Sequence, residues 1–167
     1  MEKILENISK SLQDVLESTF SNYPSGVCYL TGHLMAEILK RMGYDAFEVT
    51  GSFALKTKAN KFIIYGDRKL KGLNVGDYHT WCEVETDKNM FIVDPSIKYN
   101  KVTLRNLGYK VHSVIPNTII TTTESGYYFR YIEDKSKVKY SKSFLEAVDQ
   151  EVIEKLIIET IDLSKTK

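Results

Sequence analysis

The sequence is poor in cysteine and has no long apolar run. Two cysteines in 167 residues are too few for a disulfide framework, and they fit a reducing compartment in which a thiol is either packed or reactive. No segment approaches the roughly 20 apolar residues that a membrane-spanning helix needs. Residues 1–20 alternate charged and apolar side chains and lack the pattern of a cleaved signal. We therefore expect a cytoplasmic protein without membrane contact; secretion by a signal-independent route stays open.

Net charge is also nearly absent. The chain carries 23 basic and 22 acidic residues, for a formal charge of +1, which argues against binding nucleic acid through a strongly basic surface. Short basic stretches at 56–61 and 135–139 are interpreted as solvated turns. Hydrophobic residues make up 43% of the chain and aromatic residues 11%. This content is enough for a packed core, and the length suits a single domain over residues 1–167.

Helical periodicity is present at both ends of the chain. Residues 1–20 repeat apolar side chains at three- and four-residue spacing, which predicts an amphipathic helix. A second, central helix is expected from a cap at Ser25 or Gly26 to about Met42, with Gly43 just past its last turn. Residues 141–163 show the same spacing and predict a C-terminal helix.

Between these helices the pattern is typical of strands, because β-branched and aromatic residues cluster there. Strands are expected at 46–55, 61–66, 78–85, 90–94, 109–115 and 126–132, with an edge strand or extended connection at 118–123 and a loop at 67–77. The order predicts an α+β fold with a central helix packed on an antiparallel sheet. The domain would comprise an N-terminal helix (1–20), a core (23–96), further strands (97–140) and a C-terminal helix (141–163).

Cys28 is a candidate nucleophile. It falls in the first turn of the expected central helix, where unpaired backbone N–H groups and the helix dipole favour a thiolate. The same N–H groups are able to stabilise a developing oxyanion. The competing interpretation is a buried, inert cysteine, which is common in helices.

His79 and Asp94 are expected to meet across a hairpin. In an extended strand, alternate residues share a face, so His79 and Trp81 lie on one face and Cys82 on the other. If Thr86 pairs with Asn89 at the turn, Asp94 faces Trp81 and is the diagonal neighbour of His79. A slip of one residue would send Asp94 to the opposite face. In this register the hairpin supplies a base, His79, and an acid that orients it, Asp94.

These motifs resemble the transglutaminase-like core of the papain-like cysteine enzymes. That superfamily shows a cysteine at a helix start, a helix ending in Gly plus a hydrophobe, a strand with Val/Thr-Gly, His-x-Trp-x-Glu-Val, and a strand ending Val-Asp-Pro-Ser/Thr. The matching pieces here are Gly26-Val27-Cys28, Leu39-Lys40-Arg41-Met42-Gly43-Tyr44, Val49-Thr50-Gly51, His79-Thr80-Trp81-Cys82-Glu83-Val84 and Ile92-Val93-Asp94-Pro95-Ser96. The resemblance covers residues 23–96, under half of the chain.

The resemblance implies a Cys28–His79–Asp94 triad that attacks an amide through a covalent acyl-enzyme. It also implies that Asn22 helps to form the oxyanion hole, although papain-type enzymes keep a longer Gln there, and that Trp81 packs beside the histidine. The substrate would be a protein, a peptide or a small amide, with no cofactor. Peptidase, deamidase and transglutaminase-like activities all remain open, and so does the oligomeric state.

Two other interpretations compete with the triad. Cys28, His33, His79, Cys82 and Asp94 include zinc-ligand types, but no Cys-x-x-Cys or His-x-x-x-His spacing is present, so no metal site is expected and Cys82 is interpreted as a core thiol. Alternatively, the chain is an inactive or non-enzymatic interaction module that uses an aromatic surface such as 126–131. His112 is interpreted as structural. Thiol reactivity distinguishes the enzyme from the interaction module.

Overall fold

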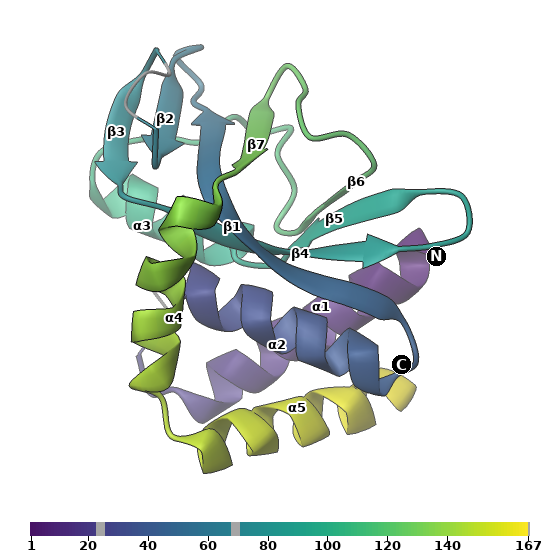
Figure 1. The fold of residues 1–167 in the computed structure, drawn as a ribbon. Helices are drawn as coiled ribbons and strands as arrows, with labels where there is room; N and C mark the ends of the chain where they lie inside the picture. The colour runs from purple at the N-terminus through teal and green to yellow at the C-terminus, as the bar shows by residue number, and fades with distance from the viewer. Residues whose placement is uncertain (23–25, 68–70, 167) are drawn as a thin grey trace.

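The computed structural model describes residues 1–22, 26–67 and 71–166. The described residues form five α-helices and a seven-stranded sheet (Figure 1). The helices are α1 (Glu2–Thr19), α2 (Cys28–Arg41), α3 (Ile97–Asn106), α4 (Val138–Glu146) and α5 (Gln150–Lys165), with a short 3₁₀ turn at Lys135–Lys137. The strands are β1 (Asp45–Lys56), β2 (Phe62–Tyr65), β3 (Leu73–Gly76), β4 (His79–Glu85), β5 (Met90–Asp94), β6 (Ile119–Thr121) and β7 (Phe129–Glu133). The predicted α+β class is confirmed.

The strand β1 organises the sheet. The strand order is β3-β2-β1-β4-β5-β6, and β7 also pairs with β1. The first part of β1, Asp45 to Gly51, pairs with β4, and the part from Gly51 to Leu55 pairs with β7. Gly51 stands where these two pairings meet, and a Cβ atom there would lie 2.0 Å from the Ile132 carbonyl oxygen. Only glycine therefore permits β7 to approach β1 at this point.

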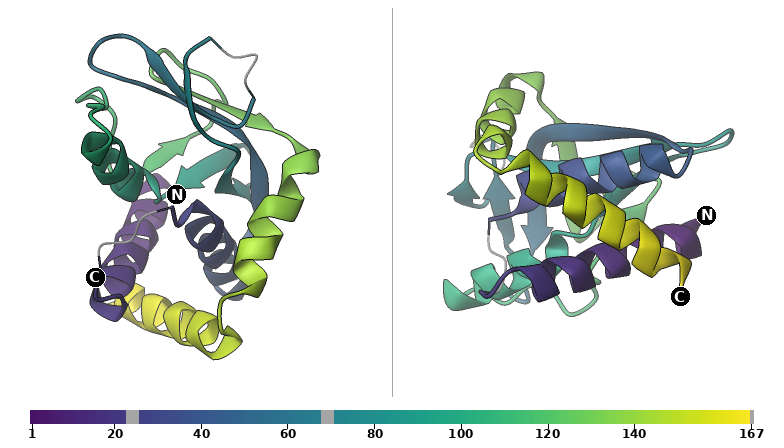
Figure 2. Two further views of the ribbon diagram at one scale, coloured as in Figure 1. Left: turned by 90° about the vertical axis from the view of Figure 1, so that its left-hand side faces the viewer. Right: turned by 90° about the horizontal axis from the view of Figure 1, so that it is seen from below.

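The two faces of the sheet bury two apolar cores. On one face, α1, α2 and α5 cover a core that includes Leu12, Leu34 and Leu156 and the β4 side chains Cys82 and Val84. Figure 2 shows these three helices side by side beneath the sheet. On the other face, α3 and the chain that follows it cover a second core. The second core includes Phe53, Trp81, Ile92, Leu104 and Tyr131.

Five details of the predicted secondary structure are wrong. The stretch 97–140 begins with the helix α3 rather than a strand, and 109–115 contributes only an isolated bridge between Thr57 and Val111. The expected loop 67–77 contains β3, which pairs parallel to β2, so the sheet is not wholly antiparallel. The C-terminal helix is two helices, because Asp149 caps α5 by accepting a hydrogen bond from the Glu151 amide at 2.8 Å. The predicted cap of α2 at Gly26 is off by one residue, because Val27 is the N-cap, and Ser25, the alternative cap, lies outside the described residues.

The polarity of α3 explains why its pattern was misread. Of its ten residues, only Ile97, Tyr99, Asn100 and Leu104 are buried. An apolar stripe this sparse gives no clear helical period, and Val102 and Thr103 are β-branched. Ile97 and Leu104 pack into the second core and Tyr99 into the first, so tertiary packing rather than local propensity stabilises the helix.

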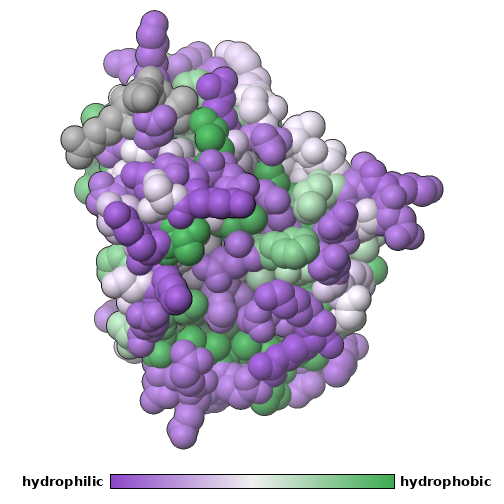
Figure 3. Space-filling view, in the orientation of Figure 1, coloured by the Kyte–Doolittle hydropathy of each residue, from purple (hydrophilic) through white to green (hydrophobic). Residues whose placement is uncertain are grey.

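The outer surface is largely polar. Figure 3 shows hydrophilic side chains over most of the face seen in Figure 1, with smaller patches of apolar side chains between them. Among the described residues, no helix is both long and apolar enough to cross a membrane.

Candidate active site

Cys28 is the first residue of α2. Gly26 precedes the helix with φ of +65°, in the left-handed region that favours glycine, and Val27 is the N-cap. No described side chain caps this end of the helix, so its first backbone N–H groups point away from the helix without intrahelical partners. The Cys28 side chain is half-buried. The expected position of the thiol at a helix start is therefore confirmed.

Close packing of α2 on β4 brings the thiol toward the sheet. A Cβ atom on Gly32 would lie 2.7 Å from Thr80 Cγ2 and 3.2 Å from both the Thr80 carbonyl carbon and the Trp81 amide nitrogen. Gly32 is four residues after Cys28, so the two lie on the same side of the helix. Thr80 directly follows His79 in β4. Glycine at position 32 thus lets the helix approach the strand that carries the histidine.

His79 and Asp94 meet as the hairpin register predicts. Cys82 pairs with Val93 and Val84 with Phe91, and the Thr86 amide donates to the Asn89 carbonyl at 2.9 Å. His79 Nε2 lies 2.7 Å from Asp94 Oδ2, and each side chain is only 1% exposed. The predicted placement of the two side chains on one face is confirmed.

Asp94 has hydrogen-bond partners in addition to His79. Its Oδ2 atom also accepts a hydrogen bond from the Tyr131 hydroxyl at 2.9 Å. Its Oδ1 atom accepts from the Ser96 amide at 3.1 Å and from the Ser96 hydroxyl at 2.6 Å. A buried carboxylate needs such partners, because an unpaired buried charge is costly. The network fixes the orientation of the carboxylate toward His79.

The electrostatics of His79 favour its protonated form. Burial lowers the pKa of His79, but the charge of Asp94 and its hydrogen bond outweigh burial, and the interaction with Cys28 adds to them, so that the pKa rises to about 10. Nε2 is engaged by Asp94, which leaves Nδ1 for the thiol. Nδ1 is buried and makes no hydrogen bond to any described residue. An imidazolium beside a thiol is the electrostatic setting that favours a thiolate.

Aromatic rings enclose the histidine. The Phe53 ring stacks on His79 with centroids 4.5 Å apart, the Tyr65 ring lies at 5.7 Å, and the Trp81 ring is stacked at 6.3 Å. Trp81 is 1% exposed and donates from Nε1 to Glu83 Oε1 at 3.0 Å. Trp81 does pack beside His79, as expected, but Phe53 makes the closer ring contact. These rings exclude water from the His79–Asp94 pair, which strengthens their interaction.

Three residues of this environment were missed by the sequence analysis. Phe53 and Tyr131 come from strands whose aromatic content was read only as strand propensity. Ser96 directly follows Asp94-Pro95, and a serine two residues after an aspartate is a recognisable signal for a side-chain-capped turn. Tyr131 carried no local signal, because it reaches Asp94 from 37 residues away.

Asn22 is exposed and lies near the start of α2. It lines a small cavity of about 310 Å³ together with Val27 and Tyr29, the two neighbours of Cys28 in sequence. No described contact joins its side chain to Cys28 or His79. Its role in an oxyanion hole stays a prediction.

An exposed aromatic cluster lies close to Cys28. Tyr29 and Tyr78 both contact the Phe144 ring, with centroids 5.5 and 6.3 Å apart, and Tyr78 stacks on Tyr140 at 6.0 Å. Burial raises the pKa of both Tyr29 and Tyr78, and the neighbouring Cys28 raises it further. Phe144 is 54% exposed. We call Tyr29, Tyr78, Tyr140 and Phe144 the aromatic cluster.

The alternative metal-ligand set does not converge. Among the described residues no group of three or more histidine, cysteine, aspartate or glutamate side chains could hold a metal ion. Cys82 belongs to the core on the helical face of the sheet, opposite His79, and burial raises its pKa. His33 pairs with Glu48 at 2.9 Å, and the His112 ring contacts the Tyr128 ring at a tilt, with centroids 4.7 Å apart. Cys82, His33 and His112 therefore have local packing partners of their own.

Comparisons with known proteins show the fold alone. No family model matches the chain, and no curated protein matches it. A solved crystal structure of a genomics target is similar in fold, with a TM-score of 0.61 over 97% of this chain and 78% of that chain. The two sequences are 12% identical.

Proposed function

We propose that this protein is a cysteine-dependent acyl-transfer enzyme of the papain-like, transglutaminase-core type. The observation that carries the proposal is the buried His79, whose Nε2 is fixed by Asp94 at 2.7 Å and whose buried Nδ1 has no nitrogen or oxygen partner among the described residues. The thiol of Cys28 interacts with that histidine from the start of α2. A base that a carboxylate orients on one side and that has a thiol beside it fits nucleophile activation.

The proposed reaction begins with the Cys28 thiolate, formed by proton transfer to His79. The sulfur bonds to the carbonyl carbon of an amide, and the carbonyl electrons move to oxygen, where the first N–H groups of α2 stabilise the oxyanion. When the intermediate collapses, the C–N bond breaks and the His79 imidazolium gives its proton to the leaving nitrogen. Water or an amine then attacks the thioester, His79 accepts its proton, and the thiol is regenerated. The acceptor decides between hydrolysis by water and transfer to an amine, and the amide that is attacked decides between peptide hydrolysis and deamidation.

The aromatic cluster suits the substrate side of this site. Tyr29 directly follows Cys28 in the chain, its ring stacks on Phe144 with centroids 5.5 Å apart, and Phe144 is 54% exposed. Aromatic surface that stays exposed next to a nucleophile is able to bury an apolar side chain of a peptide. We therefore propose peptide or protein amides flanked by apolar or aromatic residues as the substrate class.

A catalytically inactive interaction module on the same fold is the second candidate. The observation that favours it is the complete burial of His79 together with the exposed aromatic cluster. Such a module would use the aromatic surface for a protein partner. Its Cys28 would behave as an ordinary thiol.

Alkylation of Cys28 distinguishes the two candidates. In a Cys82→Ser background, iodoacetamide labelling of Cys28 is followed from pH 5 to 9, with His79→Gln as the test variant and His112→Gln as the matched control. The enzyme hypothesis expects rapid labelling below pH 7 that His79→Gln slows by about tenfold or more and His112→Gln leaves unchanged. The enzyme hypothesis would be contradicted if the labelling rate of Cys28 rose with pH as for an ordinary thiol in the Cys82→Ser protein and in both histidine variants. Glutamine-containing peptides with and without flanking aromatic residues then test turnover.

A further inference from the structure

Two adjoining cavities lie along the segments 57–63 and 108–113, away from the residues of the candidate active site. The larger has a volume of about 870 Å³ and the smaller about 350 Å³. Both are lined by Lys58, Tyr109 and Lys110, so these three residues border both cavities. A volume in this range suits a small organic ligand.

The smaller cavity is lined by four fixed cations and no carboxylate. Lys58, Lys101, Arg105 and Lys110 line it, and the rest of its lining is neutral or histidine. None of the four forms an ion pair within the described part of the chain. The chain as a whole has almost equal numbers of acidic and basic residues, so a cavity with cations alone departs from the average surface.

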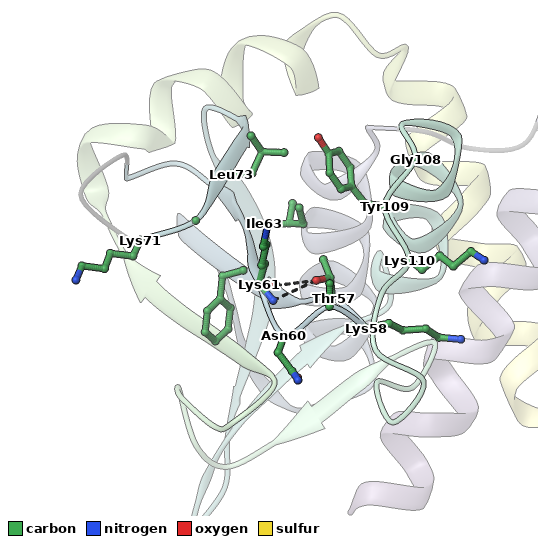
Figure 4. Close-up of a pocket in the computed structure, with 13 residues that line it drawn as sticks. Thr57, Lys58, Asn60, Lys61, Ile63, Lys71, Leu73, Gly108, Tyr109 and Lys110 are labelled. Atoms are coloured by element: carbon green, nitrogen blue, oxygen red, sulfur yellow. Dashed lines mark hydrogen bonds between the residues drawn. The ribbon is translucent and has the colours of Figure 1, made fainter.

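The fold forces these cations together in two like-charged pairs. The Lys58 amide donates to the Lys110 carbonyl at 2.9 Å, beside the antiparallel bridge between Thr57 and Val111, so Lys58 and Lys110 are cross-strand neighbours. Figure 4 shows their side chains extending from the cavity in the same direction. Lys101 and Arg105 are four residues apart on α3. Like charges repel in both arrangements.

The end of α3 explains how the two pairs meet. Gly108 has a φ of +91° and its amide donates to the Arg105 carbonyl, which ends the helix and turns the chain back toward β1. The negative end of the helix dipole favours Arg105 in the last turn. It does not account for Lys58 and Lys110, which come from outside the helix.

Lys101 adds a second indication of an anion. It is partly withdrawn from water, and burial lowers its pKa. Its ammonium group donates to the Ile115 carbonyl and to Asn117 Oδ1, which are neutral acceptors. A partly desolvated cation with only neutral partners gains from a bound anion, because desolvation strengthens the attraction.

The larger cavity supplies an apolar wall beside the cations. Phe62, Ile63, Leu73 and Tyr109 line it, together with Lys61 and Lys71. In Figure 4, Leu73 and Tyr109 face one another across the space above Ile63. An apolar surface next to an anion site matches a ligand with one charged end and one apolar end.

We propose that the two cavities bind a small organic phosphate, with the phosphate among Lys58, Lys101, Arg105 and Lys110 and the apolar portion against Leu73 and Tyr109. Four cations match a dianion, and side-chain N–H groups of Arg and Lys are the usual phosphate donors. This site is independent of Cys28, and its test does not require any catalytic activity.

Phenyl phosphate is the probe, measured by isothermal titration calorimetry at constant ionic strength. Saturable binding is expected, and it should weaken by about tenfold or more in Arg105→Gln/Lys110→Gln, since two charged hydrogen-bond donors are lost. Lys3→Gln/Lys88→Gln removes two exposed cations elsewhere and should bind like the wild type. Leu73→Asn should weaken phenyl phosphate more than inorganic phosphate, because it makes the wall polar without adding a charge.

Three results would overturn the proposal. One is the absence of saturable phenyl phosphate binding to the wild type. A second is equal weakening of phenyl phosphate binding in Arg105→Gln/Lys110→Gln and in the control Lys3→Gln/Lys88→Gln, which would mean nonspecific charge attraction. The third is tight binding of a single-stranded RNA oligonucleotide with no binding of phenyl phosphate, which would assign the cations to a polyanion surface. Circular dichroism spectra of each variant establish that it is folded.

Discussion

Replacing Asp94 by Asn should reverse the direction in which the pKa of His79 is shifted. In the wild type, the carboxylate raises the pKa of His79 from 6.5 to about 10 despite complete burial. An asparagine keeps the size of the side chain but removes its charge. Burial then becomes the dominant influence, and burial disfavours the imidazolium. We therefore expect the pKa of His79 in Asp94→Asn to fall below 6.5.

The same shift predicts a dependence of stability on pH. A folded-state pKa raised from 6.5 to about 10 corresponds to about 5 kcal/mol of stabilisation, taken at 1.36 kcal/mol per pKa unit. Because the folded pKa is raised, this stabilisation is fully present below pH 6.5 and is lost as the pH rises toward 10. The difference in unfolding free energy between the wild type and Asp94→Asn should shrink over that range.

The assay is a titration of the His79 ring by ¹H–¹⁵N NMR from pH 5 to 10.5, with urea unfolding at pH 6, 8 and 10 in parallel. His112 in the same spectra is the internal control, since it lies outside the Asp94 network. A wild-type His79 that titrates near 6.5, or an Asp94→Asn protein whose deficit in stability stays constant with pH, would refute the reasoning.

Three further predictions concern the surroundings of the proposed triad. Tyr131→Phe removes a 2.9 Å hydrogen bond to the buried Asp94 carboxylate. This should lower the unfolding free energy in urea by about 1.5–3 kcal/mol. The control Tyr127→Phe, at a ring that is 65% exposed, should change it by less than about 0.5 kcal/mol. Gly32→Ala places a methyl group 2.7 Å from Thr80 Cγ2; overpacking of about 1–3 kcal/mol should outweigh the gain in helix propensity, and Cys28 alkylation should slow as α2 moves from β4. An unchanged rate of Cys28 alkylation in Gly32→Ala would show that Gly32 does not determine the position of the thiol. Phe144→Ala should leave the unfolding free energy within about 1 kcal/mol of the wild type. It should raise KM for peptides with aromatic residues and leave KM unchanged for peptides without them. Equal KM changes for both peptide sets would exclude a substrate role for the ring.

The hairpin was predictable because local rules determine it. Alternation places His79 and Trp81 on one face, and a single turn contact between Thr86 and Asn89 fixes the register that brings Asp94 alongside. The start of α2 at Cys28 followed from its apolar periodicity and the glycine before it. For these elements, the residues that decide the geometry lie within a few positions of the residues that are positioned.

Other features were not predictable because distant residues decide them. The strand β3 is four residues long and pairs parallel to β2, so its short sequence carries no period long enough to recognise. The chain at 109–115 has strand-like composition, but it passes over the second core instead of joining the sheet, with one bridge to Thr57. Composition in both cases describes the surface that a segment contacts, and not its hydrogen-bonding partner.

Segments outside residues 23–96 contribute hydrogen bonds to the candidate site. Tyr131, in β7, donates to the same oxygen of Asp94 that contacts His79. Gln13, in α1, is buried and donates to the Pro95 carbonyl at 2.8 Å, directly after Asp94 in the chain. Each of these bonds crosses more than 35 residues of sequence, and each fixes the end of β5 from a different side. A fragment limited to residues 23–96 would lack both bonds, so Asp94 would keep only its hydrogen bonds from Ser96 and its contact with His79. The orientation of His79, and with it the proposed activation of Cys28, therefore depends in part on segments outside residues 23–96.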